Sequence, residues 1–205
     1  STRQHAGRTA RETQPEELDF LVHPKLLLDV IQRQAGSLAK SILEGIMNGV
    51  DAKCRQIQIK LTETNVVIED DGRGITQREH IDKFFRTFGQ PHEESEGKVY
   101  GTFRMGRGQL FAFGKNIWRT GPFIMDVDIK QRGLRFNLVT AKKKHDGCRI
   151  DIDLYTGLSD NLVDYLSTLT NNFANFFRDN FYRFNSRRVW AHLFAWLGNS
   201  LEHVF

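Results

Sequence analysis

The order of helical and strand patterns along the chain constrains its fold more than any other feature. Apolar residues recur with helical spacing from Pro24 to Ala52, interrupted at Gly36, after which Ser37 can cap a second helix. Two short patterns typical of strands follow, an alternating one at 57–61 and Val66-Val67-Ile68 after a polar turn. Because the helices form a block and the strands follow one another, we predict an α+β two-layer sandwich rather than a doubly wound parallel sheet.

The remaining segments extend this pattern toward the C-terminus. Residues 77–88 predict a helix with a phenylalanine-rich face. Residues 89–108 predict a long glycine-rich loop, of the kind that often covers an active site. Further helices are predicted at 110–115 and from 158 to about 177. Strands are predicted at 123–129, 134–139 and 149–154, with a turn at 142–147 before the last of them.

Composition places the chain among globular proteins. Its 205 residues, 40% hydrophobic and 26% charged, suffice for one large domain, or for one domain and part of a second. The net charge of +4 permits contact with nucleic acid without arguing for it. Cys54 and Cys148 support neither a disulfide framework nor a four-ligand zinc site, so we expect a cytoplasmic protein. No apolar run is long enough to cross a bilayer, and we expect no membrane partner.

Three polar residues, Glu44, Asn48 and Asp51, lie at positions i, i+4 and i+7 of the second predicted helix. This spacing puts them on one helical face, opposite the apolar residues. An amide oxygen there can coordinate a magnesium ion that is bound to phosphates, and a carboxylate one turn away can take a proton from an attacking water. Taken alone, such a face is more often a solvated surface.

Two glycine-containing segments add to this helix. Asp70-x-Gly72-x-Gly74 follows a β-branched strand, where the carboxylate can accept a hydrogen bond from an exocyclic amine such as adenine N6. The run from Gly101 to Gly108 contains Arg104, Gly106 and Arg107 and precedes a short predicted helix. Its backbone amides can therefore face phosphate oxygens, and its arginines add positive charge. Each segment alone is more often an ordinary turn or loop.

The three features in this order resemble the GHKL superfamily, whose Bergerat fold is shared by gyrase B, heat-shock-90 chaperones, MutL and the catalytic domains of histidine kinases. The resemblance covers about residues 24–155, and the pattern is most similar to MutL and heat-shock-90-like ATPases. It rests on Glu44-Gly-Ile-Met-Asn48-Gly-Val-Asp51-Ala52, Glu69-Asp70-Asp71-Gly72-Arg73-Gly74-Ile75, the run Gly101–Gly108, and Asp146-Gly147-Cys148-Arg149-Ile150-Asp151-Ile152. It implies a two-layer α/β sandwich in which helices cover one face of a mixed sheet.

The resemblance also implies roles on the phosphate side of a nucleotide. Glu44 would be the general base that activates water, Asn48 would hold Mg²⁺, and Asp51 would line the pocket. Residues of the glycine-rich run would surround the phosphates, namely Gly101, Arg104, Gly106, Arg107 and Gly108. Four residues separate the first two glycines of this run, whereas the superfamily commonly has Gly-x-x-Gly-x-Gly.

On the adenine side, the resemblance implies that Asp70 accepts a hydrogen bond from adenine N6. Gly72 and Gly74 would let the base pack closely, and Ile75 would lie beneath it. Cys148 stands where the superfamily usually has a threonine that helps to hold a water molecule on the adenine, and a thiol is a weaker hydrogen-bonding group than a hydroxyl.

This resemblance implies an ATPase that uses ATP and Mg²⁺ and turns over slowly in isolation, because lid closure and dimerisation assemble the site. The expected partners are ATP and a second copy of the full-length protein, with a protein or nucleic acid client left open. An alternative is a non-catalytic nucleotide-sensing or interaction module that uses Lys142–Lys144 and Arg187-Arg188. A histidine-kinase catalytic domain is a further alternative, which the short segment before the first helix disfavours.

We expect the chain to have three parts. Residues 1–17 are polar and aperiodic and are predicted to be a flexible arm. Residues 18–157 would form the ATP-binding domain, and residues 158–205 a helical, aromatic-rich extension. Within the extension, residues 184–189 resemble the opening of the transducer domain that follows the ATPase domain in dimerising members, so we expect a fragment of a longer protein.

Overall fold

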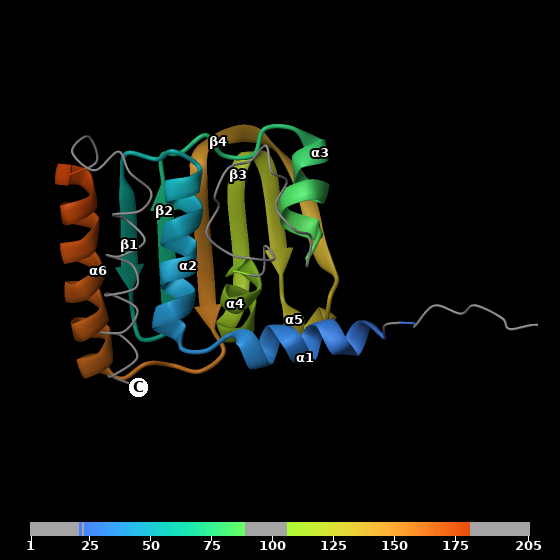
Figure 1. Cartoon of the computed structure of the whole chain (residues 1–205), viewed down its shortest axis with the longest axis horizontal. Coiled ribbons are helices and arrows are strands. Elements are labelled where there is room, and N and C mark those ends of the chain that lie inside the picture. Colours follow the sequence, from blue (N-terminus) through green and yellow to red (C-terminus); the bar gives the residue numbers. More distant parts are fainter. Residues whose placement is uncertain (1–20, 22, 89–105, 181–205) are drawn as a thin grey trace, which may run out of the picture.

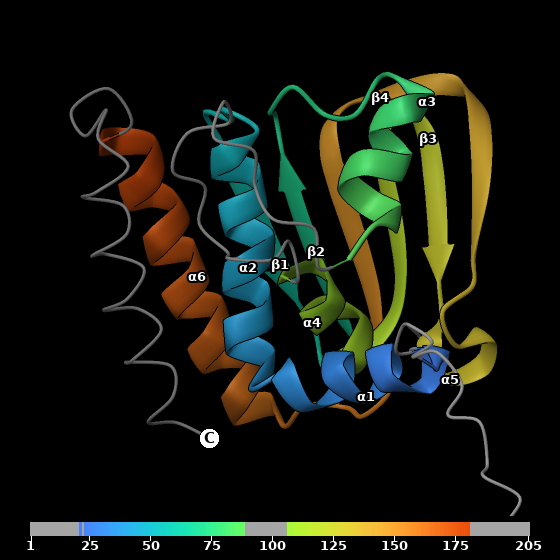
Figure 2. The same ribbon diagram turned by 45° about the vertical axis from the view of Figure 1, so that its right-hand side comes forward.

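A four-stranded sheet and a layer of helices make up the described part of the chain, which comprises residues 21, 23–88 and 106–180 of a computed structural model. Figures 1 and 2 show α2 (Leu38–Asp51) and α4 (Gly106–Phe113) on one face of the sheet and α6 (Asp160–Asn180) beside its edge strand β1 (Ile57–Leu61). The helix α1 (Pro24–Gln34) runs from the lower end of α2 beneath α4. The predicted α+β two-layer sandwich is thereby confirmed. The predicted arm at 1–17 and the residues beyond 180 lie outside the described part.

The first two helices begin and end where the sequence places them. α1 spans Pro24–Gln34 and has its proline in the first turn, where the missing N–H costs no hydrogen bond. Gly36 follows with a φ of 64°, a conformation that favours glycine. Ser37 caps α2 (Leu38–Asp51), because its hydroxyl accepts a hydrogen bond from the Lys40 N–H at 3.2 Å.

The strands are β1 (Ile57–Leu61), β2 (Asn65–Asp70), β3 (Gly114–Val127) and β4 (Phe136–Leu154), in the order β1-β2-β4-β3. Every neighbouring pair in this order is antiparallel. The resemblance implied a mixed sheet, and the described strands correct that detail. A short turn joins β1 to β2, and the small helix α5 (Ile129–Arg132) joins β3 to β4, and such short connections favour antiparallel pairing.

The long strands β3 and β4 differ from the sequence-based assignment. In Figure 1 both turn over at the upper end of the molecule, and the register between them shifts between Thr120 and Phe123. The segment 142–147, predicted as a turn, belongs to β4. Residues 114–120 form the first arm of β3, although 114 and 115 were predicted to be the end of a helix. Gly114 allows this start, because a Cβ there would lie 2.3 Å from the Asp153 carbonyl oxygen.

Two helical segments also differ in detail from the prediction. The helix predicted at 77–88 is α3 (Arg78–His80), followed by a π-helical segment, η1 (Ile81–Arg86). The end of the predicted loop is helical, because α4 spans Gly106–Phe113. The predicted C-terminal helix is α6, Asp160–Asn180. Within the described ranges, no helix is both long and apolar enough to span a membrane.

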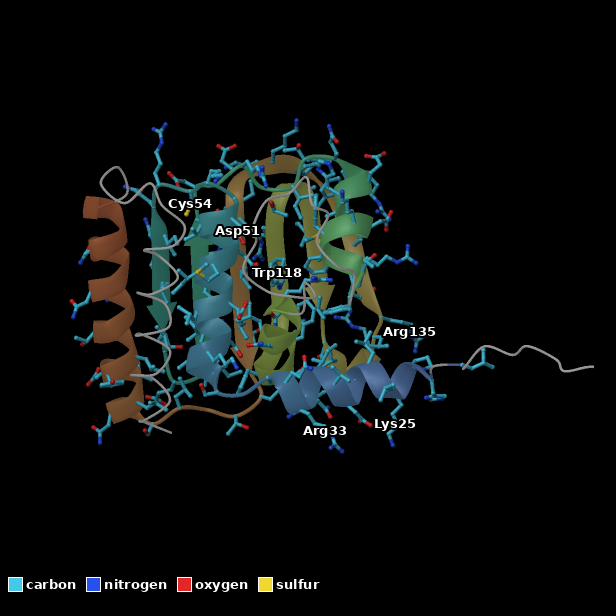
Figure 3. All side chains as sticks on the ribbon, in the orientation of Figure 1. Lys25, Arg33, Asp51, Cys54, Trp118 and Arg135 are labelled. Atoms are coloured by element: carbon cyan, nitrogen blue, oxygen red, sulfur yellow. The ribbon has the colours of Figure 1, made fainter. Side chains whose placement is uncertain are left out.

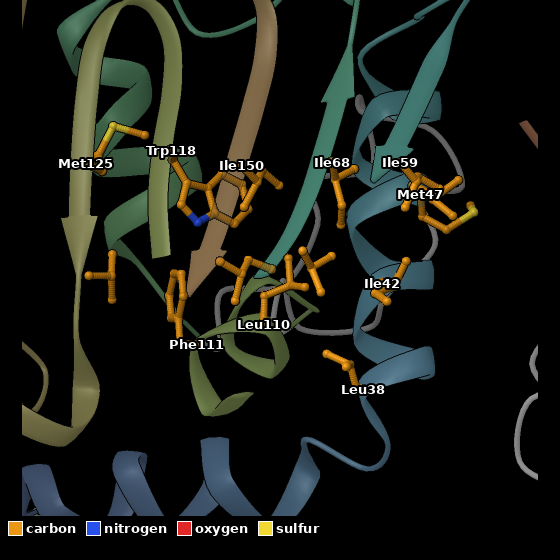
Figure 4. Close-up of a cluster of buried hydrophobic side chains, with 14 of the residues drawn as sticks. Leu38, Ile42, Met47, Ile59, Ile68, Leu110, Phe111, Trp118, Met125 and Ile150 are labelled. Atoms are coloured by element: carbon orange, nitrogen blue, oxygen red, sulfur yellow. The ribbon is translucent and has the colours of Figure 1, made fainter. Parts of the chain in front are cut away.

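The core lies between the helices and the sheet (Figure 4). Ile42 and Ile46 of α2 pack toward Ile68 of β2, and all three side chains are almost fully buried. Gly45 lets α2 approach the sheet closely, since a Cβ at this position would lie 2.6 Å from the Ile68 Cδ1 atom. Close packing along this stretch holds α2 against the sheet.

The opposite face of the sheet carries charged side chains that pair across neighbouring strands. The Arg149 guanidinium donates hydrogen bonds to the Glu69 carboxylate at 2.9 Å and to the Asp151 carboxylate at 2.8 Å. Arg119 of β3 also pairs with Asp151. Glu69, Arg149 and Arg119 are register neighbours on β2, β4 and β3, so these ion pairs link the three strands.

Candidate functional site

The three polar residues predicted to share a helical face, Glu44, Asn48 and Asp51, all lie in α2. Glu44 and Asp51 are half-buried and Asn48 is exposed. Burial raises the pKa of the Glu44 carboxyl, the Lys40 ammonium opposes this shift, and the Asp51 carboxylate adds to it. Glu44 and Asp51 are therefore close enough to influence each other, and Figure 3 places Asp51 near the upper end of α2.

Asp70 ends β2 and turns its side chain toward α2. It is only 8% exposed, and a Cβ on Gly49 of α2 would lie 3.1 Å from the Asp70 Cβ atom. Its Oδ1 atom accepts a hydrogen bond from the Gly72 N–H at 2.8 Å. Burial raises the pKa of Asp70 to about 6, although hydrogen bonds from the backbone of Gly72 and of Cys148 act in the opposite direction. A carboxyl group with this environment is typical of a functional site.

The neighbouring carboxylate, Asp71, has a different and structural position. Its Oδ1 atom accepts hydrogen bonds from the backbone N–H groups of Arg55 at 2.6 Å and Gln56 at 2.8 Å. Asp71 is exposed and ties the start of β1 to the end of β2. Of the two consecutive aspartates, only Asp70 therefore lies against α2.

Two glycines with positive φ lie in close contact with each other beside Asp70. Gly74 has a φ of 59° and Gly147 a φ of 73°. A Cβ on Gly74 would lie 2.6 Å from the Gly147 carbonyl oxygen, and a Cβ on Gly147 would lie 1.9 Å from the Asp70 carbonyl oxygen. The prediction from the sequence was that Gly74 lets an adenine base pack closely. In the structure, the missing side chain of Gly74 lets the loop after β2 contact β4 at Gly147. Gly72 likewise lies against Ala52, since a Cβ on Gly72 would lie 2.7 Å from the Ala52 Cβ atom.

Comparison with protein families identifies the part of the chain that contains this arrangement. Residues 36–120 match the family described as histidine kinase-, DNA gyrase B-, and HSP90-like ATPase. The matched range begins before α2 and ends at Thr120, so it includes both Glu44 and Asp70. Residues 36–120 are thus similar to GHKL-type ATPases. The resemblance stated from the sequence motifs is thereby confirmed.

Solved structures with a similar arrangement share little sequence with this chain. One is the ATPase region of Saccharomyces cerevisiae topoisomerase II, at 14% identity and a TM-score of 0.48, and another is the N-terminal domain of a DNA repair protein, at 17% identity and a TM-score of 0.44. The alignments cover 64% and 73% of this chain, but 43% and 45% of those chains. The chain therefore spans less than half the length of either, and no curated protein matches it in sequence.

Cys148 of β4 lies directly beside Asp70 of β2. It pairs in register with Asp70 of β2 on one side and with Thr120 of β3 on the other. Burial raises the pKa of its thiol, and the carboxylates of Asp70 and Glu69 add to this effect. Cys54 is fully buried, and its thiol pKa is raised by burial and by Asp70 and Asp71. Both sulfurs therefore stay protonated at neutral pH.

The glycine-rich run is only partly within the described residues. Gly101 and Arg104 lie outside them, and Gly106 is the first residue of α4. Gly108 is buried, and a Cβ there would lie 3.1 Å from the Phe88 ring and 3.3 Å from Ile31. Its lack of a side chain is thus accounted for by packing between α4 and its neighbours.

Arg107, predicted to face phosphate, contacts backbone carbonyl groups of the protein. It is 7% exposed, and its Nε atom donates a hydrogen bond to the Phe85 carbonyl oxygen at 2.7 Å. Its Nη2 atom donates to the Thr87 carbonyl oxygen, and the guanidinium lies 4.1 Å from the centre of the Phe88 ring. These contacts join α4 to the end of η1 and hold the guanidinium within the protein, and the predicted contact of Arg107 with phosphate stays a prediction.

Sequence reasoning missed two residues of this site. Thr120 lies in the arm of β3 that the sequence patterns did not predict, so nothing marked it. Gly49 was inside the quoted motif without a role, although Gly45 and Gly49, four residues apart on a helix, indicate a face that approaches another segment closely. In residues 23–88 and 106–180, no group of three or more metal-ligating side chains could hold a metal ion.

Proposed function

We propose that this chain binds ATP and hydrolyses it to ADP and phosphate with Mg²⁺. The observation that carries the proposal is the buried Asp70 carboxyl, held against Gly49 of α2, the helix that carries Glu44 and Asn48. The helix α2 thus holds the candidate base-recognition group, Asp70, at a fixed position relative to the candidate catalytic carboxylate, Glu44. The family match over residues 36–120 supports the same function.

Asp70 is suited to select adenine. As a carboxylate it accepts hydrogen bonds only, so it fits the amine at adenine position 6 and opposes the carbonyl oxygen of guanine. Its burial makes this choice stringent, because an unpaired buried charge is costly. The hydrogen bond from Gly72 fixes the orientation of the carboxylate.

Glu44 is suited to act on the water that attacks the γ-phosphate. Its raised pKa makes it a stronger proton acceptor than an exposed glutamate. In the proposed step, Glu44 takes a proton from the water, the water oxygen bonds to the γ-phosphorus, and the bond to the β–γ bridging oxygen breaks. ADP and phosphate leave, and the proton returns to solvent.

Asn48 would be the protein ligand of the magnesium ion. It is exposed on the same face as Glu44, and an amide oxygen is a suitable ligand for Mg²⁺. Mg²⁺ usually keeps several waters and binds the phosphates themselves, so one protein ligand fits the described residues. When bound, the ion neutralises charge that develops on the phosphates. Asp51, Ile75 and Cys148 would line the pocket, and Gly101, Arg104, Gly106 and Gly108 would face the phosphates.

In the full-length protein, we propose that ATP binding closes the segment 89–108 and brings two copies together. The alternative, a nucleotide-sensing module without turnover, is supported by Arg107 and Gly108, whose contacts are made within the protein. Turnover separates these two functions. Transfer of phosphate to a histidine would instead indicate a kinase domain.

Calorimetric titration with adenylyl imidodiphosphate, a non-hydrolysable ATP analogue, tests the proposal. We expect the parent to bind, Asp70→Asn to lose binding, and Glu44→Ala to bind like the parent but to lose turnover. Glu69→Gln is the matched control, because Glu69 is next to Asp70 but pairs with Arg149 on the opposite face of the sheet. A folded parent that does not bind, or an Asp70→Asn variant that binds like the parent, would contradict the proposal.

A further inference from the structure

The Thr120 hydroxyl bridges two segments that flank Asp70. Thr120 is 1% exposed, and its Oγ1 atom accepts a hydrogen bond from the Ile75 N–H at 2.7 Å. The same hydroxyl donates a hydrogen bond to the Gly147 carbonyl oxygen at 2.9 Å. Ile75 lies in the loop after β2 and Gly147 in β4, so a single hydroxyl joins elements that are distant in sequence.

Glycines make the contacts around this bridge unusually close. A Cβ on Gly74 would lie 2.8 Å from the Thr120 Oγ1 atom. Gly121, with a φ of 53°, comes so near the loop that a Cβ there would lie 2.2 Å from the Ile75 carbonyl oxygen. The bend of β3 therefore contacts Ile75 twice: Thr120 binds its N–H, and Gly121 leaves room for its carbonyl oxygen.

The bridge is also connected to Asp70 through the sheet. Thr120, Cys148 and Asp70 are register neighbours on β3, β4 and β2. Gly147 lies against the Asp70 carbonyl group, and the backbone N–H of Cys148 acts on the Asp70 carboxyl. A shift of Gly147 would thus move the carboxylate as well as the loop that carries Gly74.

We infer that Thr120 is a positioning residue for adenine recognition, an inference that rests on the proposed function. Its hydroxyl fixes the loop Gly74–Ile75 and the turn at Gly147 at the spacing in which the Asp70 carboxylate meets the exocyclic amine. Without the hydroxyl, the Ile75 N–H and the Gly147 carbonyl group lose their shared partner, and the pocket loses its fixed width.

The test compares Thr120→Val, which keeps the shape of the side chain and removes the hydroxyl, with Thr120→Ser, which keeps the hydroxyl. Binding of the non-hydrolysable analogues of ATP and of GTP is measured by calorimetry, and thermal unfolding is measured without nucleotide. We expect Thr120→Val to bind the ATP analogue about tenfold more weakly. We expect its preference for the ATP analogue over the GTP analogue to fall by a similar factor, and Thr120→Ser to remain within about threefold of the parent.

Ile152→Val is the control for a purely structural effect, because Ile152 is a fully buried residue of β4 in the same sheet. It should lower the melting temperature and leave the preference for adenine unchanged. If Thr120→Val does not unfold cooperatively, Thr120→Ala replaces it in the comparison with serine.

Three results would overturn the inference or its basis. A Thr120→Val variant with the parent's affinity and base preference overturns the inference, and so does a Thr120→Ser variant as weak as valine. A folded parent that binds no adenine nucleotide overturns the proposed function instead, so the two failures are distinguishable.

Discussion

The Asp70 carboxylate lies directly against Gly49 of α2, and a Cβ at Gly49 would come within 3.4 Å of the Asp70 Oδ2 atom. The helix that carries the catalytic candidates therefore also forms one wall around the carboxylate that we propose binds adenine. Any change at Gly49 reaches the site without removing a polar group from it.

We predict that Gly49→Ala weakens nucleotide binding about tenfold, because Asp70 must move by a few tenths of an ångström. Displacing Asp70 costs stability, whereas alanine favours a helix by roughly 1 kcal/mol over glycine. Because these two effects oppose each other, thermal stability should change little. Gly45→Ala is the control, since its added methyl group would meet Ile68 and not Asp70. It should cost stability and keep affinity; equal affinities for Gly49→Ala and the parent would contradict the prediction.

Asp70 should make both binding and stability depend on pH. Its pKa is raised from an ordinary 3.8 to about 6, so the folded protein binds this proton more tightly than the unfolded chain. The contribution of Asp70 to the free energy of unfolding therefore falls as pH rises from about 4 to 6, and it is constant above that range. Nucleotide affinity has the opposite dependence and should fall below pH 6, where the carboxylate becomes protonated.

It follows that Asp70→Asn should stabilise the nucleotide-free protein at pH 7 by up to roughly 3 kcal/mol while abolishing binding. Urea unfolding of the parent and the variant between pH 4 and 7.5 measures this difference. The difference should grow with pH and level off above pH 6. A difference that is independent of pH would show that burial does not raise the pKa of Asp70.

Glu44→Gln should reduce turnover by about 10²–10⁴-fold and preserve binding of the ATP analogue, because the amide cannot accept the proton. Steady-state phosphate release measures turnover. In the parent, turnover should fall as pH drops through the raised pKa of Glu44. Asp51→Asn provides a second test, because the Asp51 carboxylate helps to raise the pKa of Glu44. Its removal should shift the acidic limb of the pH–turnover profile to lower pH. Unchanged turnover in Glu44→Gln would exclude Glu44 as the base.

Arg107→Met should destabilise the protein by about 2–4 kcal/mol, because the carbonyl groups of Phe85 and Thr87 lose a charged donor. Chemical denaturation measures the loss. Arg86→Met is the control, since Arg86 is largely exposed and pairs only with its helical neighbour Asp82 among the described contacts. If Arg107→Met instead keeps its stability and loses affinity for ATP but not for ADP, the phosphate role predicted from the sequence is correct.

Local sequence patterns predicted the parts of this fold that local interactions determine. α1 begins at Pro24 and α2 begins directly after its cap Ser37, and the proline ring and the capping hydroxyl act within one helical turn. The motifs around Glu44 and Asp70 also supplied the family. The register of β2 determines that Asp70, and not Asp71, faces α2. Local patterns did not predict this choice, which came from the resemblance to the family motif.

Long-range pairing explains what the sequence did not predict. The run Lys142–Gly147 has the composition of a turn, yet it is part of β4. Thr120 and the residues before it are in a strand because they pair with the other arm of β4. Arg107 has the charge of a phosphate ligand, but only the fold brings the carbonyl groups of η1 within its reach. None of these partners is close in sequence, so no local pattern could indicate them.

The contact between Gly147 and the Asp70 carbonyl group makes the site a late product of folding. Glu44, Asn48 and Asp70 are all present in the chain well before β4, and contacts of such large sequence separation form slowly. A chain that ended before Gly147 would carry all three residues and still lack the part of β4 that pairs with β2 beside Asp70. The proposed nucleotide site is therefore complete only when the second arm of β4 has left the ribosome and paired with β2.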